Sequence, residues 1–156
     1  MKAPRVREAK PAERGIFMSL CRAFLEENVT LGGWMQADDT NVEQLAKFFD
    51  AYTTGTMEGT VKFIGHEAVI MAGAIGSPFK MSFGKGAQGW FTYVKPEVRK
   101  KGYSKLLREA VISDLTDMGF DMYFGSTSEL NEAAVASVPK GFERGQFIVM
   151  KRLTKE

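Results

Sequence analysis

The fold of this chain is decided by the stretch WFTYVKPEVRKKGYS, residues 90–104. Its first part, Trp90–Val94, is an apolar strand pattern that Pro96 closes. A helical pattern runs on to Gly119, and a further strand pattern occupies residues 121–125. Strand, helix and strand in this order form a β-α-β crossover. We therefore expect the two strands to lie parallel in one sheet, with a right-handed connection between them.

The residues before this unit alternate between strand and helix patterns. A short strand is expected at Val6–Ala9, and a helix follows Pro11. Apolar residues recur at helical spacing and predict the buried face of this helix: Ile16, Phe17, Leu20, Cys21, Phe24 and Leu25. After a loop at residues 28–39, the sequence Thr40-Asn41-Val42-Glu43 resembles a capping box and predicts the start of a second helix.

Two strand patterns follow the second helix and a loop at residues 52–60. They cover residues 61–64 and 68–75, and the turn Gly65-His66-Glu67 joins them, so they are expected to pair antiparallel. Four glycines and a proline mark residues 76–89 as a loop. Beyond the crossover we expect a short helix at residues 131–138 and a last strand at residues 147–153.

The whole pattern reads β-α-α-β-β-β-α-β-α-β, which indicates an α/β or α+β fold. The chain has 156 residues, enough for one domain that spans residues 1–156. Its 21 Lys and Arg residues nearly balance 19 Asp and Glu residues, which argues against a protein that coats nucleic acid.

The composition also limits the location and the chemistry of the protein. Neither a secretory signal nor an apolar run long enough to span a membrane is apparent, so we expect a cytoplasmic protein without a membrane partner. The single cysteine, Cys21, cannot form an internal disulfide and is expected in the core. One cysteine and one histidine, His66, cannot supply a usual zinc site, so no metal is expected.

The segment between the strand at 90–94 and the following helix has the features of an anion site. The first backbone N–H groups of a helix lack internal partners and carry partial positive charge. Gly102 allows the backbone to approach a ligand closely, and Ser104 is nearly as small. Arg99, Lys100 and Lys101 add positive charge, so a diphosphate fits here; a solvated basic face is the alternative interpretation.

Two motifs in this order resemble those of the GNAT superfamily of N-acetyltransferases. Arg99-x-x-Gly102-x-Ser104 is similar to its Q/R-x-x-G-x-G/A motif, with Ser104 where Gly or Ala is more common. The segment Asn131-Glu132-Ala133-Ala134, followed by Gly141-Phe142, resembles its later Asn-x-x-Ala … Gly-Phe motif. The resemblance extends over most of the chain, from Val6 to Leu153.

The resemblance implies a mixed, mostly antiparallel sheet with helices on both faces. A central parallel pair of strands would splay beside a bulge at residues 90–94 and admit the arm of acetyl-CoA. The residues implied to bind this cosubstrate are Val94, Arg99, Lys100, Lys101, Gly102, Tyr103, Ser104 and Asn131. An amine of a small molecule or a protein would attack the thioester directly. Dimers are common among such folds, and a homodimer stays open.

The catalytic candidates are Tyr93, Asn131 and Ser137. Many members of the family use a tyrosine seven residues after the asparagine as a general acid, but this chain has Val138 there. Ser137 or a water is one substitute, and Tyr93 is a candidate for a proton relay. This departure leaves a second hypothesis open, a GNAT-like module that binds acyl-CoA or a protein without catalysis.

Other polar residues have weaker claims to a catalytic role. His66 has a suitable intrinsic pKa but lies in a predicted turn, as does Glu67. Asp38 and Asp39 would border the acceptor site of this family, although capping of the second helix is the simpler role. Nucleic-acid binding through residues 99–101 is a third hypothesis, which the small net charge opposes.

Overall fold

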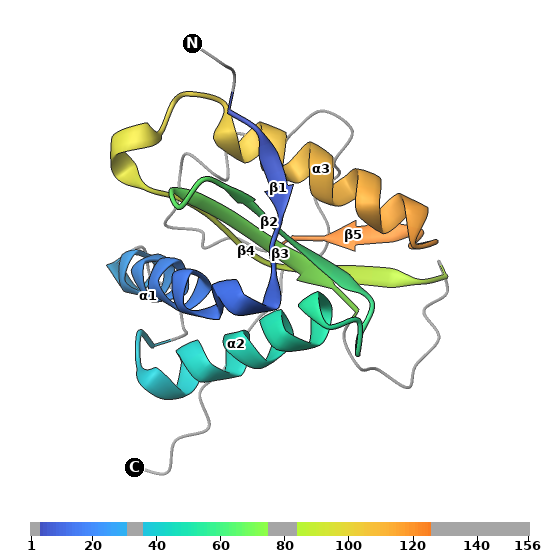
Figure 1. Ribbon diagram of the computed structural model, residues 1–156, viewed down its shortest axis with the longest axis horizontal. Helices are drawn as coiled ribbons and strands as arrows, with labels where there is room; N and C mark the ends of the chain where they lie inside the picture. The colour runs from blue at the N-terminus through green and yellow to red at the C-terminus, as the bar shows by residue number, and fades with distance from the viewer. Residues whose placement is uncertain (1–3, 31–35, 75–83, 126–156) are drawn as a thin grey trace.

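The computed structural model describes residues 4–30, 36–74 and 84–125 of the chain. The described elements follow the predicted order from the first strand to the strand after the crossover helix (Figure 1). The strands are β1 (Val6–Glu8), β2 (Gly59–Ile64), β3 (Ala68–Gly73), β4 (Gly86–Val94) and β5 (Met122–Phe124). The helices are α1 (Arg14–Thr30), α2 (Asp39–Thr53) and α3 (Tyr103–Asp117), with 3-10 turns η1 (Pro11–Glu13) and η2 (Pro96–Val98).

The five strands form one sheet in the order β1-β2-β3-β4-β5. The first three neighbouring pairs are antiparallel, and β4 pairs with β5 in parallel. The crossover through α3 therefore joins two parallel strands, as the sequence predicts. The mixed, mostly antiparallel sheet of the predicted fold class is confirmed.

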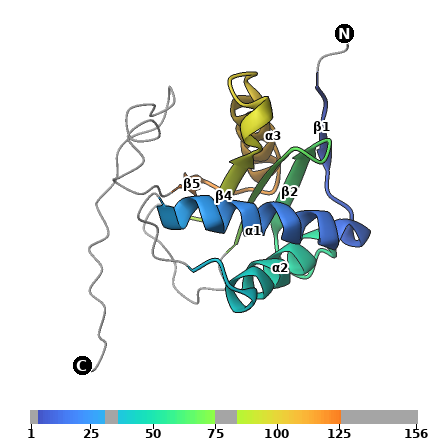
Figure 2. The same cartoon turned by 90° about the vertical axis from the view of Figure 1, so that its left-hand side faces the viewer.

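Helices cover both faces of the sheet, and each face has its own hydrophobic core. Figures 1 and 2 show α1 and α2 together on one side of the strands and α3 on the other. The core under α1 and α2 includes Phe17, Cys21 and Phe49, and the core under α3 includes Leu107 and Val111. Burial raises the pKa of the Cys21 thiol to about 12, so this cysteine is the core residue that its helical spacing predicts.

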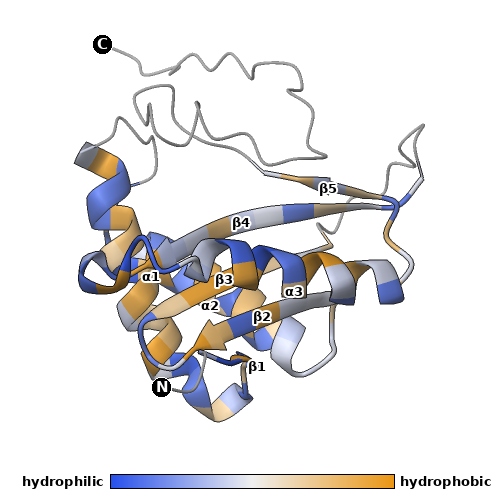
Figure 3. Cartoon of the chain, turned by 90° about the horizontal axis from the view of Figure 1, so that it is seen from above, coloured by the Kyte–Doolittle hydropathy of each residue, from blue (hydrophilic) through white to orange (hydrophobic). Residues whose placement is uncertain are grey.

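Strand β3 supplies side chains to both cores, because successive residues of a strand point to opposite faces. Val69 and Met71 face α1 and α2, whereas Ile70 and Ala72 face α3. All six residues of β3 are buried, and much of the strand is orange, the colour of hydrophobic residues, in Figure 3. This central strand therefore joins the two cores through one backbone.

The N-terminus of α2 corrects the predicted capping box. Helix α2 begins at Asp39, and the N-cap is Asp38, whose carboxylate accepts a 2.8 Å hydrogen bond from the Asn41 N–H. Thr40, the predicted cap, lies inside the first turn. The preceding helix also continues to Thr30 and so includes the first three residues of the predicted loop. In addition, none of the described helices is both long and apolar enough to cross a membrane.

Two strands begin earlier than predicted. Strand β2 begins at Gly59 instead of residue 61, and β4 begins at Gly86, four residues before the predicted start at Trp90. The glycines that indicated a loop at residues 76–89 thus include two residues of a strand, Gly86 and Gly89. The helix predicted at 131–138 and the strand predicted at 147–153 lie outside the described residues.

Candidate active site

The parallel pairing of β4 with β5 covers only the start of β4. Three residue pairs join the two strands, and the last pair is Gln88 with Phe124. Strand β4 continues to Val94, and along residues 89–94 none of the described strands pairs with it on the side of β5. We call residues 89–94 the β4 edge. Within the described residues, the parallel pairing therefore ends at Gln88 and Phe124.

A β-bulge lies at the start of the β4 edge. The register with β3 shifts by one residue, since Met71 pairs with Phe91 but Ala72 pairs with Gly89. The extra residue is Trp90, and both Trp90 and Phe91 pack against the core under α1 and α2. Two successive side chains on one face are what a bulge produces. The bulge that the family resemblance implies at residues 90–94 is therefore present.

Hydrogen bonds hold the bulge in place. The Trp90 indole N–H donates to the Tyr52 hydroxyl over 2.9 Å, and this hydroxyl donates to the Ala74 carbonyl, also over 2.9 Å. The Phe48 and Trp90 rings are 4.3 Å apart between centroids. Burial raises the pKa of Tyr52 to about 12, so the phenol stays protonated and able to donate.

Beyond the bulge, one residue of β4 is exposed. Thr92 is exposed, whereas the flanking residues Phe91 and Tyr93 are buried. No other residue of β4 is exposed. Because helices cover both faces of this sheet, the exposed Thr92 marks a place on the β4 edge that a ligand can reach.

The first turn of α3 has the open amides expected of an anion site. Gly102 is the N-cap with a φ of 79°, and no side chain among the described residues caps this helix end. Its first turn also contains no acidic residue. Lys100 has a left-handed φ of 65°, which is uncommon outside glycine. The side chains of Lys100, Lys101 and Ser104 are exposed around these amides.

Residue 102 is a glycine because of its backbone conformation, not because its surroundings are crowded. None of the described residues has a heavy atom within 4 Å of a Cβ placed on Gly102. Its positive φ, however, strains any residue with a side chain. Glycine therefore permits the backbone turn that leads into the first turn of α3.

The Arg99 side chain does not point toward these amides, although its charge suggested a phosphate ligand. Its Nε donates to the Val94 carbonyl over 2.9 Å, and its terminal nitrogen contacts the Glu27 carboxylate at 2.5 Å. The guanidinium also lies over the Tyr93 ring, 5.8 Å from its centroid. Arg99 thus joins the end of β4 to the end of α1 and fixes the loop before α3; we call these contacts the Arg99 bridge.

Tyr93 is a packed residue of the core under α1 and α2. Its relative exposure is 8%, and it lies among the buried residues of that core. Burial, together with the nearby Glu27 charge, raises the pKa of its phenol. Tyr93 therefore stays protonated through the neutral range, and within the described residues its ring contact is with Arg99.

The remaining sequence candidates within the described residues lie in a turn or at a helix end. His66 is exposed in the β2–β3 turn. Asp38 caps α2, and Asp39 joins α2 to α1 through an ion pair with Arg22, so both acidic residues have structural contacts. Asn131, Ser137 and the residue at the usual tyrosine position, Val138, lie outside the described residues.

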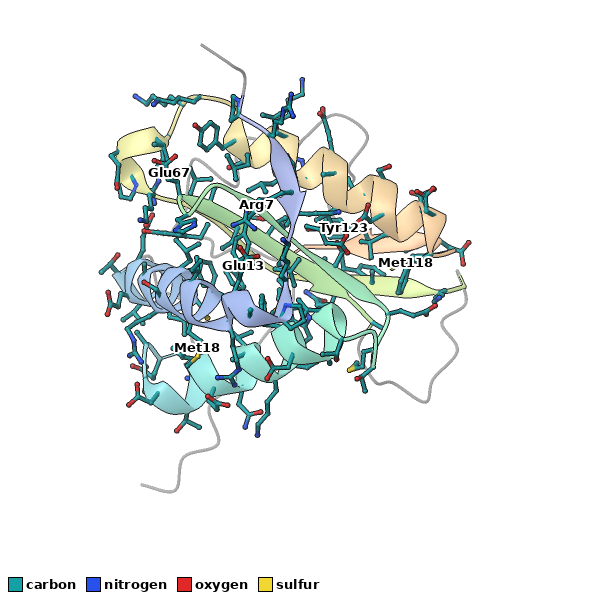
Figure 4. The ribbon with its side chains drawn as sticks, viewed as in Figure 1. Arg7, Glu13, Met18, Glu67, Met118 and Tyr123 are labelled. Atoms are coloured by element: carbon teal, nitrogen blue, oxygen red, sulfur yellow. The ribbon has the colours of Figure 1, made fainter. Side chains whose placement is uncertain are left out.

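One pair of residues at the end of the β4–β5 pairing has no counterpart among the sequence candidates. The Tyr123 side chain of β5 crosses over Gly89 of β4, where a Cβ would lie 2.8 Å from the phenol Cζ. Tyr123 packs against the core under α3, and Figure 4 labels it beside that helix. In the sequence, Tyr123 is only one member of an alternating strand pattern, and Gly89 resembles a loop glycine. Neither residue therefore gave a local signal.

Comparisons with known proteins gave matches among solved structures. No protein-family model matches the chain, and no curated protein matches it. The aminoglycoside N-acetyltransferase AAC(6')-Iy, in complex with the bisubstrate analogue CoA-S-monomethyl-acetylneamine, is 16% identical, with a TM-score of 0.68. The match covers 99% of this chain and 100% of that chain.

Two further structures agree with this similarity. A GCN5-related N-acetyltransferase of Ralstonia eutropha is 14% identical with a TM-score of 0.70, over 97% of this chain and 100% of that chain. A protein of Clostridium acetobutylicum, described as a predicted acetyltransferase with acetyl-CoA, is 13% identical with a TM-score of 0.70, over 97% of both chains. These matches cover nearly the whole chain at TM-scores of 0.68–0.70, and they show that this chain has the fold of the GNAT superfamily of N-acetyltransferases.

Proposed function

We propose that this protein is an N-acetyltransferase that moves the acetyl group of acetyl-CoA to a primary amine of a small molecule or a protein. One observation carries this proposal: the N-terminus of α3 at Gly102, which no described side chain caps, follows the β4 edge in the chain, and within the described residues β5 does not pair with that edge. The start of α3 and a strand edge that none of the described strands covers are thus adjacent. Similar structures that contain CoA or acetyl-CoA support the same ligand.

The two parts of the site suit the two parts of acetyl-CoA. The first amides of α3, with Lys100 and Lys101 beside them, suit the diphosphate, because helix N-termini bind phosphate groups. The pantetheine arm carries amide groups and would extend along the β4 edge past Thr92, where backbone groups of a strand are able to pair with it. This arrangement would bring the thioester toward the bulge at Trp90.

The reaction requires charge stabilisation and positioning at the thioester. A backbone N–H of the β4 edge would donate to the thioester carbonyl and stabilise the negative charge that forms there. The neutral amine attacks the carbonyl carbon, the carbon–sulfur bond breaks, and the bonding electrons go to sulfur. Fixed orientation of the two reactants supplies much of the acceleration. Asn131 and Ser137 remain candidates for contacts with the arm and for proton transfer.

The cellular site of this activity is proposed to be the cytoplasm. The only cysteine of the chain, Cys21, is buried and unpaired. A buried free thiol suits a reducing compartment, in which structural disulfides are rare.

Titration calorimetry with acetyl-CoA tests the binding half of this proposal. Replacement Gly102→Val forces a β-branched residue into a left-handed conformation, and relaxation of the loop would turn the amides away from the ligand. We expect affinity to fall about tenfold or more. Gly55→Val is the matched control, because Gly55 has a φ of 76° and equally open surroundings but lies in the α2–β2 turn. Equal affinities in both variants would show that the anion site is assigned wrongly.

Thiol release from acetyl-CoA with a panel of amines tests the catalytic half. Steady release in the presence of an amine supports the transferase. Binding without release supports the alternative, a module that binds acyl-CoA without turnover, for which Val138 at the usual tyrosine position is the motivation. No binding at about 1 mM acetyl-CoA overturns both.

A further inference from the structure

We propose that the Tyr123 hydroxyl donates a hydrogen bond to the sulfur of the departing CoA thiolate. This inference rests on the proposed acetyltransferase function and adds a residue to its site. The observation behind it is the position of the Tyr123 phenol over Gly89, directly where the β4–β5 pairing ends and the β4 edge begins.

The position of Tyr123 follows from the strand register. Tyr123 pairs with Ala87 of β4, and its side chain reaches forward over Gly89, one residue before the bulge at Trp90. A ligand that is anchored at Gly102 and extends back along the β4 edge meets this phenol at the end of its path. In acetyl-CoA the end opposite the diphosphate is the thioester. The chain therefore places a hydroxyl group where the sulfur would arrive.

Gly89 leaves the space that the Tyr123 phenol occupies. Any side chain at residue 89 would collide with the Tyr123 ring, whose Cε2 lies 3.0 Å from the place of a Cβ. Glycine usually weakens a strand, so a glycine inside β4 indicates that another group needs the space. The group that occupies this space is the aromatic ring with its hydroxyl. Gly89 thus allows Tyr123 to lie across β4.

The chemistry of this phenol suits a hydrogen-bond donor better than an acid. Burial raises the pKa of Tyr123, whereas Arg108 acts weakly in the opposite direction. A reference thiol has a pKa of about 8.5, so a buried phenol would give up its proton to a thiolate unfavourably. It would instead keep the proton and donate a hydrogen bond to the negative sulfur, which strengthens in the transition state.

The balanced step is as follows. The amine nitrogen forms a bond to the acetyl carbon, the carbon–sulfur bond breaks, and sulfur takes the electron pair. The proton that the nitrogen loses passes to solvent, and the thiolate leaves with the Tyr123 O–H still bonded to oxygen. Neither an oxidant nor a reductant takes part.

The test is a titration of the thiol of CoA bound to the whole chain, followed by the ultraviolet absorbance of the thiolate. A hydrogen bond that stabilises the thiolate lowers the pKa of this thiol. In the Tyr123→Phe variant, which keeps the ring over Gly89, we expect the titration midpoint to rise by about one pH unit. We expect thiol release from acetyl-CoA to slow about tenfold in parallel, with unchanged affinity for acetyl-CoA.

Thr60→Val is the matched control. It also removes a buried hydroxyl with little change of shape, and Thr60 lies on the face of the sheet covered by α3, bonded to Asp114 over 2.8 Å. Thr60 belongs to β2, which is separated from β4 by β3. This variant should lower the urea midpoint of unfolding but leave the thiol titration where it is in the wild-type protein.

The outcomes separate the two proposals. If the wild-type chain binds CoA and Tyr123→Phe leaves the midpoint unchanged, the role of Tyr123 is wrong and the acetyltransferase proposal stands. If the midpoint moves equally in the Thr60→Val variant, the effect is a general loss of packing and the inference also fails. If the wild-type chain does not bind CoA, the proposed function itself fails.

Discussion

Arg99 adds positive charge to the motif, but its side chain bonds to other residues of the chain. A basic residue before a helix N-terminus suggests a phosphate ligand, but the guanidinium donates to the Val94 carbonyl and the Glu27 carboxylate instead. Glu27 is 72 positions away from Arg99, so no local pattern reveals this partner. Arginine suits the role because its planar fork makes several directed hydrogen bonds at once.

The Arg99 bridge and simple electrostatics predict opposite effects of Glu27 removal on the affinity for acetyl-CoA. Removal of a carboxylate near the anion site should strengthen the binding of a polyanion. If the bridge positions residues 100–102, however, Glu27→Ala should weaken acetyl-CoA binding by about threefold to tenfold, because the loop loses a support. Titration calorimetry at one fixed salt concentration measures this change.

Glu26→Ala is the matched control for this prediction. Glu26 is the neighbouring carboxylate of α1, and both carboxylates act on the Tyr93 phenol. Glu26 is exposed and makes no ion pair within the described residues. Its removal should leave affinity unchanged or slightly higher. Stronger binding in both variants would mean that Arg99 acts through its charge alone.

At the scale of elements, the capping of α2 distinguishes two competing patterns. Thr40 with Glu43 resembles a capping box, but Asp38 is the residue whose carboxylate accepts the Asn41 N–H. Asp38→Ala should destabilise the protein by about 1 kcal/mol, because the first amides of α2 lose a partner. Urea unfolding followed by circular dichroism measures the change.

Thr40→Ala is the internal comparison for the α2 cap. Thr40 is exposed inside the first turn, where alanine is the better helix former. This variant should therefore leave stability unchanged or raise it by a few tenths of a kcal/mol. A larger loss in Thr40→Ala than in Asp38→Ala would restore the capping box that the sequence suggests.

The elements that the sequence predicts well are those with an uninterrupted local signal. Helix α3 and the parallel strands around it follow from their apolar spacing and from Gly119, which adopts a φ of 83° after the helix. The start of β4 was missed, because Gly86 and Gly89 resemble turn residues. Gly89 is a glycine on account of Tyr123, a neighbour from another strand. Local pattern cannot reveal a residue whose identity is set by tertiary packing.

The same distinction between local signals and long-range contacts applies to the residues of the candidate site. Gly102 and the basic residues before α3 were predicted from sequence, because a helix start and its anion affinity are local properties. The sequence missed Tyr123, the partner of Arg99 and the support that Tyr52 gives to the bulge, since each depends on residues far apart in the chain. Tyr123, the Arg99 bridge and Tyr52 each contact a residue of the β4 edge.

At the scale of the whole molecule, the proposed site lies where the two cores meet. Along the β4 edge, Phe91 packs under α1 and α2, whereas Val94 packs under α3. The strand can depart from β5 because these two layers hold it from both faces. An opening of the β4 edge therefore does not require a loss of either core.

A shared sheet also predicts a single cooperative unfolding transition for the described fold. Leu115 of α3 and Leu45 of α2 are both buried, on opposite faces of the sheet. Replacement of either leucine by alanine should cost about 2–5 kcal/mol. Because β3 contributes side chains to both cores, each variant should lower the stability of both faces together.

Urea unfolding with two probes tests this coupling. The chain has two tryptophans, so a Trp34→Phe background leaves Trp90 as the only indole, and Trp90 packs on the face of α1 and α2. In this background Leu115→Ala, on the other face, should shift the fluorescence midpoint as far as the circular dichroism midpoint, and Leu45→Ala should do the same. A fluorescence midpoint that stays fixed in Leu115→Ala would mean that the two faces unfold separately. In that case β3 would not couple them, and a ligand bound at α3 could not stabilise the helices on the opposite side of the sheet.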